Sequence, residues 1–563
     1  MISRRDFLTA ASLAALAAAH GGLPLTRAAA AGKLSQSDLL AFEPTGNVTL
    51  VHVTDLHAQL VPVYFREPSL NIGVGEARGL VPHVTGDEFL KLFGIAAGTA
   101  SAHALTYGDF EALARTYGRM GGIDRIATIV AAIRAERDGK TLLLDGGDTW
   151  TNSWTSLQTK GQDVVDAMAL LKPDAMTAHW EFTLGEARVS ELVAGLGFPL
   201  LAQNVRESEF EDRVFPARQM FERGGVKVAV IGQAFPFTPI ANPRWMIPKW
   251  TFGLREEDLR KEVEGARAEG AGLVVLLSHN GFDVDRKVAS RVEGIDVILS
   301  GHTHDAVPEP TKVGRTLIVA SGSHGKFVSR LDLDVQAGGV NGYRYKLIPV
   351  FSDAIAPDPA MAALVQRHRE PHRAQLSRVI GKSDALLYRR GNFNGTLDDV
   401  ICDAMLAGRD AEIALSPGIR WGASLLPGQD ITFEDVTNAT AMTYPACYRM
   451  AMSGGRLKEV LEDVADNIFN PDPYYQQGGD MVRTGGLGYT IDIAKPAGQR
   501  ISDMTLLRTG QPIEAAKDYT VAGWASVNQT VEGPPIWDVV TKHIETKKVV
   551  TADGRSAVKI VGA

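Results

Sequence analysis

Short apolar runs alternate with segments of helical spacing over roughly the first two thirds of the chain. Two clear helical patterns cover residues 121–137 and 162–171, where apolar side chains recur every three or four positions. Buried strands are predicted at residues 48–53, 142–144, 175–178, 198–204, 226–232, 273–277, 296–299 and 317–320. Two further runs, residues 331–335 and 343–350, have the pattern of closing antiparallel strands. This alternation predicts an α/β domain with a largely parallel sheet.

Polar residues that bind metals follow these runs at the points where the strands end. Residues 142–150 read LLLDGGDTW, so that a Gly pair ends the strand and small residues surround Asp148. Side chains at the carboxyl ends of parallel strands gather at one edge of an α/β domain. The seven candidates found in this way are Asp55, His57, Asp148, His179, His279, His302 and His304.

Two carboxylates and five imidazoles suit a pair of divalent ions that share one carboxylate, for which Asp148 is the candidate. Such a pair holds an anionic ester and generates a hydroxide nucleophile near neutral pH. Nitrogen-rich ligation favours Mn, Fe or Zn over Mg or Ca without choosing among the first three. His324 also follows a strand but exceeds the set, so it is interpreted as a surface residue or as a support behind the ligands.

Length and composition restrict the class of protein. A chain of 563 residues exceeds one hydrophobic core, which predicts at least two domains. The net charge of −8 argues against nucleic acid as a partner. Cys402 and Cys447 are too few for a thiolate metal site, and the sequence leaves open whether they pair or are buried free thiols.

The first residues have the pattern of an export signal. Ser3-Arg4-Arg5-Asp6-Phe7-Leu8 is a twin-arginine pattern, and an Ala/Leu-rich stretch leads to Ala28–Ala31, where cleavage fits. That stretch is too short and too rich in Ala for a membrane anchor. We therefore expect residues 1–31 to be a twin-arginine signal peptide and the mature protein to be periplasmic.

The remaining chain divides into three parts. We expect a catalytic domain at residues 45–352, a linker helix at 353–379 and a C-terminal α+β domain at 380–563. Residues 60–120 form an insertion with a helix near 111–117, and the sequence leaves its role open, although insertions at an active face often shape access to the site. His368 and His372 lie among arginines in the linker, and we interpret them as a solvated helix face.

The ordered series D-x-H, G-D, S-H and G-H-T-H resembles that of the calcineurin-like metallophosphoesterases, and the layout of the whole mature chain resembles their 5′-nucleotidase branch. The resemblance implies a four-layer αββα metal domain followed by a C-terminal substrate-binding domain. It further implies one ion held by Asp55, His57, Asp148 and His304. The other ion would be held by Asp148, His179, His279 and His302.

One motif departs from that branch. Where the nucleotidases read G-N-H-E-F-D, this chain reads A-H-W-E-F-T, so His179 replaces the Asn ligand. Trp180 and Thr183 replace the catalytic His and its Asp partner, and such a proton-transfer pair contributes roughly 10²–10⁴-fold to a rate.

The sequence HWEFTLG, with residues 415–422 and 476–490, resembles the thiosulfohydrolases of periplasmic sulfur oxidation. Those enzymes are dimanganese hydrolases that release sulfate from a cysteine S-thiosulfonate on a sulfur-carrier protein, which retains a persulfide. A persulfide is a weaker base than an alkoxide, which agrees with the loss of the proton-transfer pair.

Further candidates concern the substrate anion. Arg420 resembles the substrate-binding arginine of the family, and Trp180 is expected to line the site and exclude water, or to serve only in packing. Arg390 and Arg483 are weaker candidates, interpreted as surface charges. Glycines 478, 479, 485 and 486 either admit a carrier peptide or simply form turns.

Two alternatives remain open. An ordinary nucleotidase would clamp a base between two aromatic rings of the second domain. A metal-stabilised binding protein that has lost catalysis would bind the carrier without releasing sulfate. The aromatic candidates for the clamp are Trp421, Tyr448, Tyr474, Tyr475 and Tyr489.

Overall fold

The computed structural model describes residues 34–393, 395–528, 531–552 and 557–562. The predicted signal peptide at residues 1–31 therefore lies outside the described residues. Among the helices that are described, none has the length and apolar character needed to span a bilayer.

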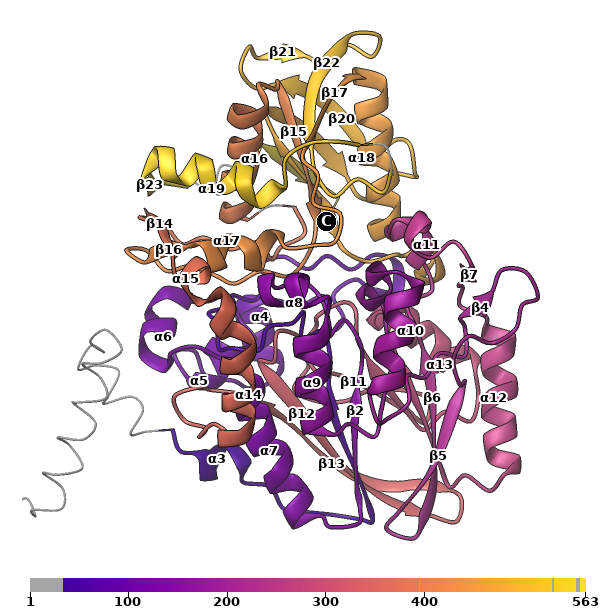
Figure 1. Cartoon of the computed structure of the whole chain (residues 1–563). Coiled ribbons are helices and arrows are strands. Elements are labelled where there is room, and N and C mark those ends of the chain that lie inside the picture. Colours follow the sequence, from indigo (N-terminus) through magenta and orange to yellow (C-terminus); the bar gives the residue numbers. More distant parts are fainter. Residues whose placement is uncertain (1–33, 394, 529–530, 553–556, 563) are drawn as a thin grey trace, which may run out of the picture.

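Two mixed sheets form the centre of the N-terminal part (Figure 1). In the first, the parallel strands β1, β2 and β3 lie beside the antiparallel pair β12 and β13, in the order β13-β12-β1-β2-β3. In the second, β6, β8, β9 and β11 run parallel, with β5 and β10 antiparallel at the two edges. The bounds in the first sheet are Val48–Val53 (β1), Thr141–Asp145 (β2), Ala175–Met176 (β3), Phe327–Gln336 (β12) and Gly339–Pro349 (β13). Those in the second are Arg218–Arg223 (β5), Val226–Gln233 (β6), Leu273–Ser278 (β8), Val297–Ser300 (β9), Thr311–Val313 (β10) and Thr316–Ala320 (β11).

Helices cover both outer faces of this pair of sheets. Alternate apolar residues of β1, β2, β6 and β8 meet in one buried cluster between the sheets. The other face of the first sheet packs on α7, α9 and α14, and that of the second on α12 and α13. The predicted four-layer αββα arrangement is confirmed. The helices span Ile123–Glu136 (α7), Gln162–Leu171 (α9), Glu256–Ala268 (α12), Phe282–Arg291 (α13) and Pro359–Arg369 (α14).

The C-terminal part has α+β architecture, as predicted. It contains the sheets β16-β14-β23, β17-β22-β15-β18 and β21-β20-β19-β24. Their strands span Val379–Ser383 (β14), Ile413–Gly418 (β15), Asp430–Thr432 (β16), Tyr448–Ser453 (β17), Asp480–Gly485 (β18), Leu487–Asp492 (β19), Ile501–Leu506 (β20), Gln511–Pro512 (β21), Asp518–Gly523 (β22), Val549–Val550 (β23) and Val558–Val561 (β24). The packed helices are Thr396–Arg409 (α16), Phe433–Thr440 (α17), Gly454–Phe469 (α18) and Ile536–Lys547 (α19).

The insertion forms short helices at the junction of the two parts. They span Gly75–Ala77 (η1), Gly86–Leu92 (α4), Ala100–Leu105 (α5) and Phe110–Tyr117 (α6). The guanidinium of Arg66 stacks on Tyr107 of the insertion and on Tyr388 of the C-terminal part. The insertion therefore connects the two parts.

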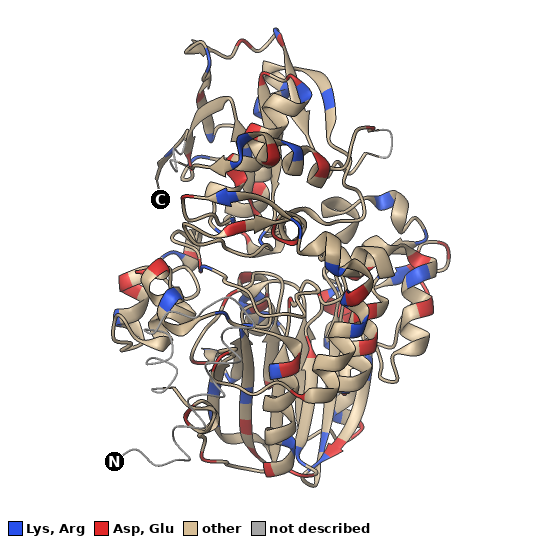
Figure 2. Cartoon of the chain, turned by 60° about the vertical axis from the view of Figure 1, so that its left-hand side comes forward, with Lys and Arg blue, Asp and Glu red and all other residues tan. Residues whose placement is uncertain are grey.

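Smaller elements complete the described chain. They are Gln36–Leu40 (α3), Trp154–Thr159 (α8), Trp180–Leu184 (η2), Glu186–Gly195 (α10), Arg206–Glu207 (β4), Thr238–Ala241 (α11), Arg244–Met246 (η3), Trp250–Thr251 (β7), Glu370–His372 (η4), Arg373–Leu376 (α15) and Pro473–Tyr475 (η5). In the view of Figure 2, acidic and basic residues are interspersed over the helices.

The structure corrects one predicted strand. Residues 198–204 form no strand, and Leu200 makes only a single bridge to Met176. Pro199 lies in this run and has no N–H to donate to a ladder, which explains why pairing does not extend.

The two cysteines, Cys402 and Cys447, are both free and buried, in agreement with the possibility that they are buried free thiols.

Candidate metal centre

The seven candidate ligands all lie in loops that leave the carboxyl ends of parallel strands. Asp55 and His57 follow β1, Asp148 follows β2, and His179 follows β3. The second sheet supplies the others, after β8 and β9. Because the two sheets pack face to face, their strand ends bring these loops to one place.

The seven side chains gather into two groups that share Asp148. One group contains Asp55, His57, Asp148 and His304, and the other contains Asp148, His179, His279 and His302. Within each group the donor atoms lie within 4.8 Å of one another. These are the two sets that the family resemblance implied, and their roles as ligands remain a proposal.

Asp148 occupies the position expected of a shared carboxylate. Its Oδ2 lies 3.0 Å from His279 Nε2, 3.3 Å from His179 Nδ1 and 3.8 Å from His57 Nε2. His57 Nε2 lies 2.9 Å from His304 Nε2, so two ring nitrogens face each other across the first group. Such a concentration of lone pairs fits the donor set of a dimetal site.

The backbone of the ligand loops is bent into the left-handed region. Five of the seven candidates have positive φ: Asp55 (52°), His57 (49°), Asp148 (56°), His302 (75°) and His304 (59°). Residues other than glycine adopt this region at an energetic cost, and such conformations concentrate at functional sites. The glycines beside them permit the turns, since a Cβ on Gly146 would lie 2.3 Å from Thr54 Oγ1.

Four of the imidazoles are oriented by an oxygen acceptor on the side away from the cluster. His57 Nδ1 faces Asn152 Oδ1 at 3.0 Å, and His179 Nε2 faces Asn242 Oδ1 at 3.1 Å. The main-chain carbonyls of Gly146 and Gln477 play the same part for His279 Nδ1 (2.6 Å) and His302 Nε2 (2.9 Å). A nitrogen that donates outward leaves the other ring nitrogen free to bind a metal.

Burial and mutual charge shift the pKa values of the cluster strongly. Burial opposes the ionisation of Asp148, but His179 and His279 outweigh it and hold the Asp148 pKa well below its usual range. Burial likewise opposes the imidazolium form of His279, yet Asp148 and Asp55 raise its pKa to about 10. Burial raises the pKa of Asp55 to about 7. Asp148 and His279 therefore form a buried ion pair, and a metal ion would have to displace the proton on His279, because imidazole ligands bind metals in their neutral form.

Glu181 is a functional residue that the sequence reasoning missed. Its fully buried carboxylate accepts backbone N–H groups of Asp148 (3.3 Å), Thr149 (2.6 Å), Trp150 (3.3 Å) and His179 (2.8 Å). It thereby joins the Asp148 turn to the His179 loop. An acid two residues after a predicted ligand, in an otherwise apolar motif, was the available signal.

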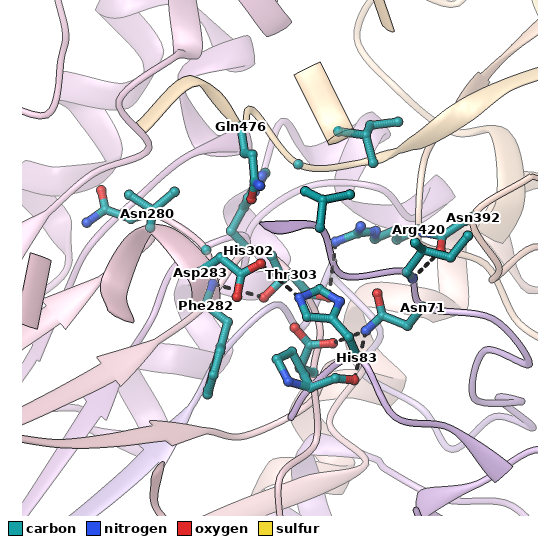
Figure 3. Close-up of a pocket in the computed structure, with 18 residues that line it drawn as sticks. Asn71, His83, Asn280, Phe282, Asp283, His302, Thr303, Asn392, Arg420 and Gln476 are labelled. Carbon is teal, nitrogen blue, oxygen red and sulfur yellow. Dashed lines mark hydrogen bonds and ion pairs between the residues drawn. The ribbon is translucent and has the colours of Figure 1, made fainter. Parts of the chain in front are cut away.

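A cleft of about 320 Å³ opens over the cluster between the two parts of the chain. Candidate ligands, Trp180, Arg420 and residues of α18 line it. Among the described residues on its wall, the imidazoles are those of His57, His179, His302 and His304, all candidate ligands. A smaller pocket of about 50 Å³ lies behind Thr303, where Arg420, His302 and Gln476 converge (Figure 3).

Trp180 lies on the cleft wall and packs into the C-terminal part. Its ring meets Trp421 edge-on at 4.8 Å and lies parallel to Tyr444 at 6.0 Å, while its backbone N–H donates to Asp148 Oδ1 at 2.7 Å. Thr183 Oγ1 donates to the carbonyl of Trp180. Both predicted roles of Trp180, lining the site and packing, are compatible with this position.

Arg420 extends into the same junction. Its Nη1 donates to Thr303 O at 3.1 Å, Nη2 donates to Gly479 O at 2.6 Å, and Nε lies 3.3 Å from Asp480 Oδ1. The guanidinium also lines the cleft. It therefore reaches both the candidate metal loop and the space for an anion.

The interpretation of Arg390 and Arg483 as surface charges is wrong. Arg390 is 5% exposed and Arg483 2% exposed. Arg483 pairs with Asp398 and Asp480, whereas Arg390 donates to Thr303 O. Carboxylates and main-chain carbonyls supplied by the fold compensate for their burial.

His324 is buried rather than on the surface. Its ring stacks on Phe65 at 4.1 Å and lies 5.5 Å from that of His57, so it supports a candidate ligand from behind. His368 pairs with Asp166 on the neighbouring helix α9. Both His368 and His372 are partly buried, which agrees with their interpretation as part of a solvated helix face.

The glycines of the second domain serve close packing. A Cβ on Gly478 would lie 2.6 Å from His302 Nε2, and one on Gly485 would lie 2.7 Å from Cys402 Cβ. Gly486 has a φ of 71° and faces the carbonyl of Glu412. These contacts within the chain account for Gly478, Gly485 and Gly486, whereas a Cβ on Gly479 would meet only the carbonyl of Gly418 at 3.7 Å.

Comparisons with known proteins agree on the class. Residues 379–533 match the family described as 5′-nucleotidase, C-terminal domain. A snake venom 5′-nucleotidase of Naja atra is 25% identical over 459 residues, covering 71% of this chain and 83% of the relative. The crystal structure of a 5′-nucleotidase precursor from Thermus thermophilus shares the fold with a TM-score of 0.73, at 23% identity over 92% of this chain and 100% of that one. Fold and site together define a metallophosphoesterase-type hydrolase of the 5′-nucleotidase superfamily.

One solved structure is more similar. The sulfate thiohydrolase SoxB of Thermus thermophilus superposes with a TM-score of 0.89 at 37% identity, over 93% of this chain and 98% of that one. The chain belongs to the SoxB family.

Proposed function

We propose that this protein is a periplasmic dimetal hydrolase that releases sulfate from a cysteine S-thiosulfonate on a sulfur-carrier protein. One observation carries the proposal: the two candidate metal groups are complete, while Trp180 and Thr183 stand where phosphomonoesterases of the superfamily have a proton-transfer pair. Membership of the SoxB family supports it.

The proposed cofactors are two divalent ions, most simply Mn²⁺. Asp55, His57, Asp148 and His304 would hold one, and Asp148, His179, His279 and His302 the other. When bound, such ions lower the pKa of a water molecule and orient the anionic group to be attacked. The outward hydrogen bonds of the imidazoles fit this role, because they leave nitrogens directed at the two carboxylates.

The overall reaction needs no proton donor for the leaving group. Water adds an oxygen to the terminal sulfone sulfur, the bond from this sulfur to the next one breaks, and sulfate departs with both protons of the water released to solvent. The electron pair of the broken bond stays on the carrier as a persulfide. Persulfide is a weak base, so a tryptophan at position 180 is tolerated where an alkoxide leaving group would require a proton.

Arg420 and Trp180 have distinct proposed roles in this step. Arg420 would hold sulfonate oxygens, since a guanidinium presents a planar set of donors to an oxyanion. Trp180 would exclude water from the side of the cleft next to Asp148. The partner is a carrier with a conjugated cysteine, and the route to the periplasm would be the twin-arginine signal in residues 1–31.

A 5′-nucleotidase is the second candidate, because the relatives of 23–25% identity are nucleotidases. The structure offers little support for a base clamp. Of the five aromatic candidates, only Trp421 lines the cleft, and its ring is 2% exposed. Tyr489 is buried in another core, and Tyr475 is 65% exposed elsewhere. The complete donor set likewise argues against a binding protein without catalysis.

The deciding experiment compares two substrates with one preparation. Manganese-loaded protein is given a thiosulfonate-loaded carrier cysteine, or AMP, and sulfate and phosphate are measured. We expect sulfate release that disappears in Asp148→Ala, with AMP hydrolysed at least 100-fold more slowly than the carrier substrate. Fast AMP hydrolysis without sulfate release would identify a nucleotidase, and carrier binding without either product would identify a binding protein.

A further inference from the structure

The C-terminal part of the chain forms hydrogen bonds with the loop that carries His302 and His304. His302 Nε2 donates to the carbonyl of Gln477 at 2.9 Å, and Arg420 Nη1 donates to the carbonyl of Thr303 at 3.1 Å. Gln477 belongs to residues 470–480, which we call the junction segment. It leads from α18 to β18, and its residues 477–480 line the cleft over the candidate metal centre.

Close approach at this point requires glycine. A Cβ on Gly478 would lie 2.6 Å from His302 Nε2, which is closer than real Cβ contacts occur. The neighbouring Gly479 has a similar φ (82° against 72°), but a Cβ there would meet only a carbonyl oxygen at 3.7 Å. Only the first glycine is therefore needed for the approach to His302.

The other end of the junction segment is fastened to α12 and α13 of the N-terminal part. Tyr474 Oη donates to Glu256 Oε2 at 2.6 Å, and Lys287 Nζ pairs with Asp472 Oδ1 at 2.5 Å. Lys287 Nζ also lies 4.1 Å from the centre of the Tyr474 ring. Arg291 bonds Glu256 through two nitrogens, at 2.7 and 3.0 Å. This is a clamp in which each polar group has a defined partner.

Within the segment, hydrogen bonds transmit the position of the clamp to Gln477. Asp472 Oδ1 accepts the backbone N–H of Tyr474 at 2.9 Å, and Pro473 O accepts that of Gln476 at 3.0 Å. Gln477 N then donates to Asn467 O of α18 at 2.8 Å. Only two residues separate Tyr474 from the carbonyl that orients His302.

We infer that Tyr474, Lys287 and Asp472 are positioning residues that hold the Gln477 carbonyl against His302 and so set the affinity of the ion bound by Asp148, His179, His279 and His302. The inference rests on the proposed two-ion site. A carbonyl acceptor fixes the tautomer and the direction of a ligating imidazole, and the loss of such a partner costs 10–100-fold in metal affinity. The metal centre is then complete only while the two parts of the chain are clamped together.

The test measures metal binding alone. Metal-free protein is dialysed against Mn²⁺, and bound ions per chain are counted for the wild type and for the double variant Lys287→Met/Tyr474→Phe, which removes both polar contacts and keeps the volume. We expect one ion to bind roughly 10-fold more weakly and the other to be unchanged. The matched control Arg286→Met/Tyr475→Phe alters the preceding residue on α13 and the exposed neighbouring tyrosine, and should bind like the wild type.

A second pair of variants tests the contact with His302 directly. Gly478→Ala and Gly479→Ala introduce the same backbone strain, but only the first places a methyl group against the imidazole. Gly478→Ala should lose one ion at concentrations that saturate the wild type, while Gly479→Ala retains both. Circular dichroism confirms that each variant is folded.

The outcomes separate the inference from the function it rests on. Wild-type affinities in the double variant, or equal losses in the two glycine variants, overturn the clamp and leave the two-ion site standing. Wild-type protein that takes up fewer than two ions overturns the site itself and the clamp with it.

Discussion

Two adjacent residues distinguish this centre from that of a phosphomonoesterase. His179 contributes a nitrogen to the cluster, and Trp180 stands at the position of the motif where the sequence resemblance implies a catalytic histidine. Thr183 Oγ1 lies 2.8 Å from the carbonyl of Trp180, so both altered positions lie within one turn of η2.

We therefore predict that Trp180→His/Thr183→Asp raises AMP hydrolysis by about 100-fold, because positioned proton transfer contributes 10²–10⁴-fold. Phosphate release under saturating Mn²⁺ measures the change. The single variant Thr183→Asp serves as the control and should remain as slow as the wild type. An inactive double variant that still binds two ions would show that the tryptophan is not what limits phosphoester hydrolysis.

At the residue scale the sequence predicted the cluster but not its supports. Strand-tip Asp and His residues could be found because parallel strands deliver their carboxyl ends to one edge. No comparable rule predicts the supporting residues Glu181, Asn152 and Asn242. They act through contacts between loops that are distant in sequence. The burial of Arg390 and Arg483 was missed for the same reason, since Thr303 and Asp398 contact them from distant parts of the chain.

Among the elements, strands and helices with strong periodicity were predicted closely, and short or interrupted ones were not. β1 and α9 have the predicted bounds, whereas residues 198–204 are apolar but interrupted by Pro199. The insertion has little periodicity overall because α4, α5 and α6 are short and each buries only three residues. One of these is His103 of α5, whose ring lies against Phe110, Tyr117 and Phe351.

His103 should make stability depend on pH. Burial, followed by the charge of Lys326, lowers its pKa to about 3 from 6.5. As the pH falls below 6.5 the unfolded chain takes up a proton that the folded chain refuses, so unfolding is favoured, and the loss is complete near pH 3. Relative to His103→Leu, the wild type should lose up to about 1.4 kcal/mol per pH unit in this window. Urea unfolding of metal-free protein at pH 7 and pH 5 measures it; parallel pH profiles would contradict the prediction.

For the whole molecule, buried charge joins the insertion to the central sheets. Lys326, which precedes β12, is 1% exposed and bonds Glu67 Oε1 at 2.5 Å and the carbonyl of Ala104 at 2.9 Å. Arg390 of the C-terminal part approaches the same carboxylate at 3.9 Å. Three separate segments therefore meet at Glu67.

Lys326→Met should lower the free energy of unfolding by about 3 kcal/mol, because it leaves the Glu67 carboxylate buried without its closest cation. Lys326→Met/Glu67→Gln should recover part of the loss, since no unpaired charge remains there. Chemical denaturation of the three proteins measures both values. A single variant within about 1 kcal/mol of the wild type would mean that Arg390 alone compensates Glu67.

The packing of Trp180 limits how the cleft exchanges its contents. Swinging the C-terminal part away would withdraw Trp421 and Tyr444 from the indole and wet a surface of roughly 150–250 Å². At about 25 cal/mol per Å², that costs on the order of 4–6 kcal/mol, so between roughly one molecule in a few hundred and one in tens of thousands would be open at a given moment. The contacts of Trp180 with Trp421 and Tyr444 therefore help to hold the two parts of the chain together. Such a cleft favours a narrow ligand that enters end-first, as the tip of an extended polypeptide does. A bulky ligand would require the two parts of the chain to separate.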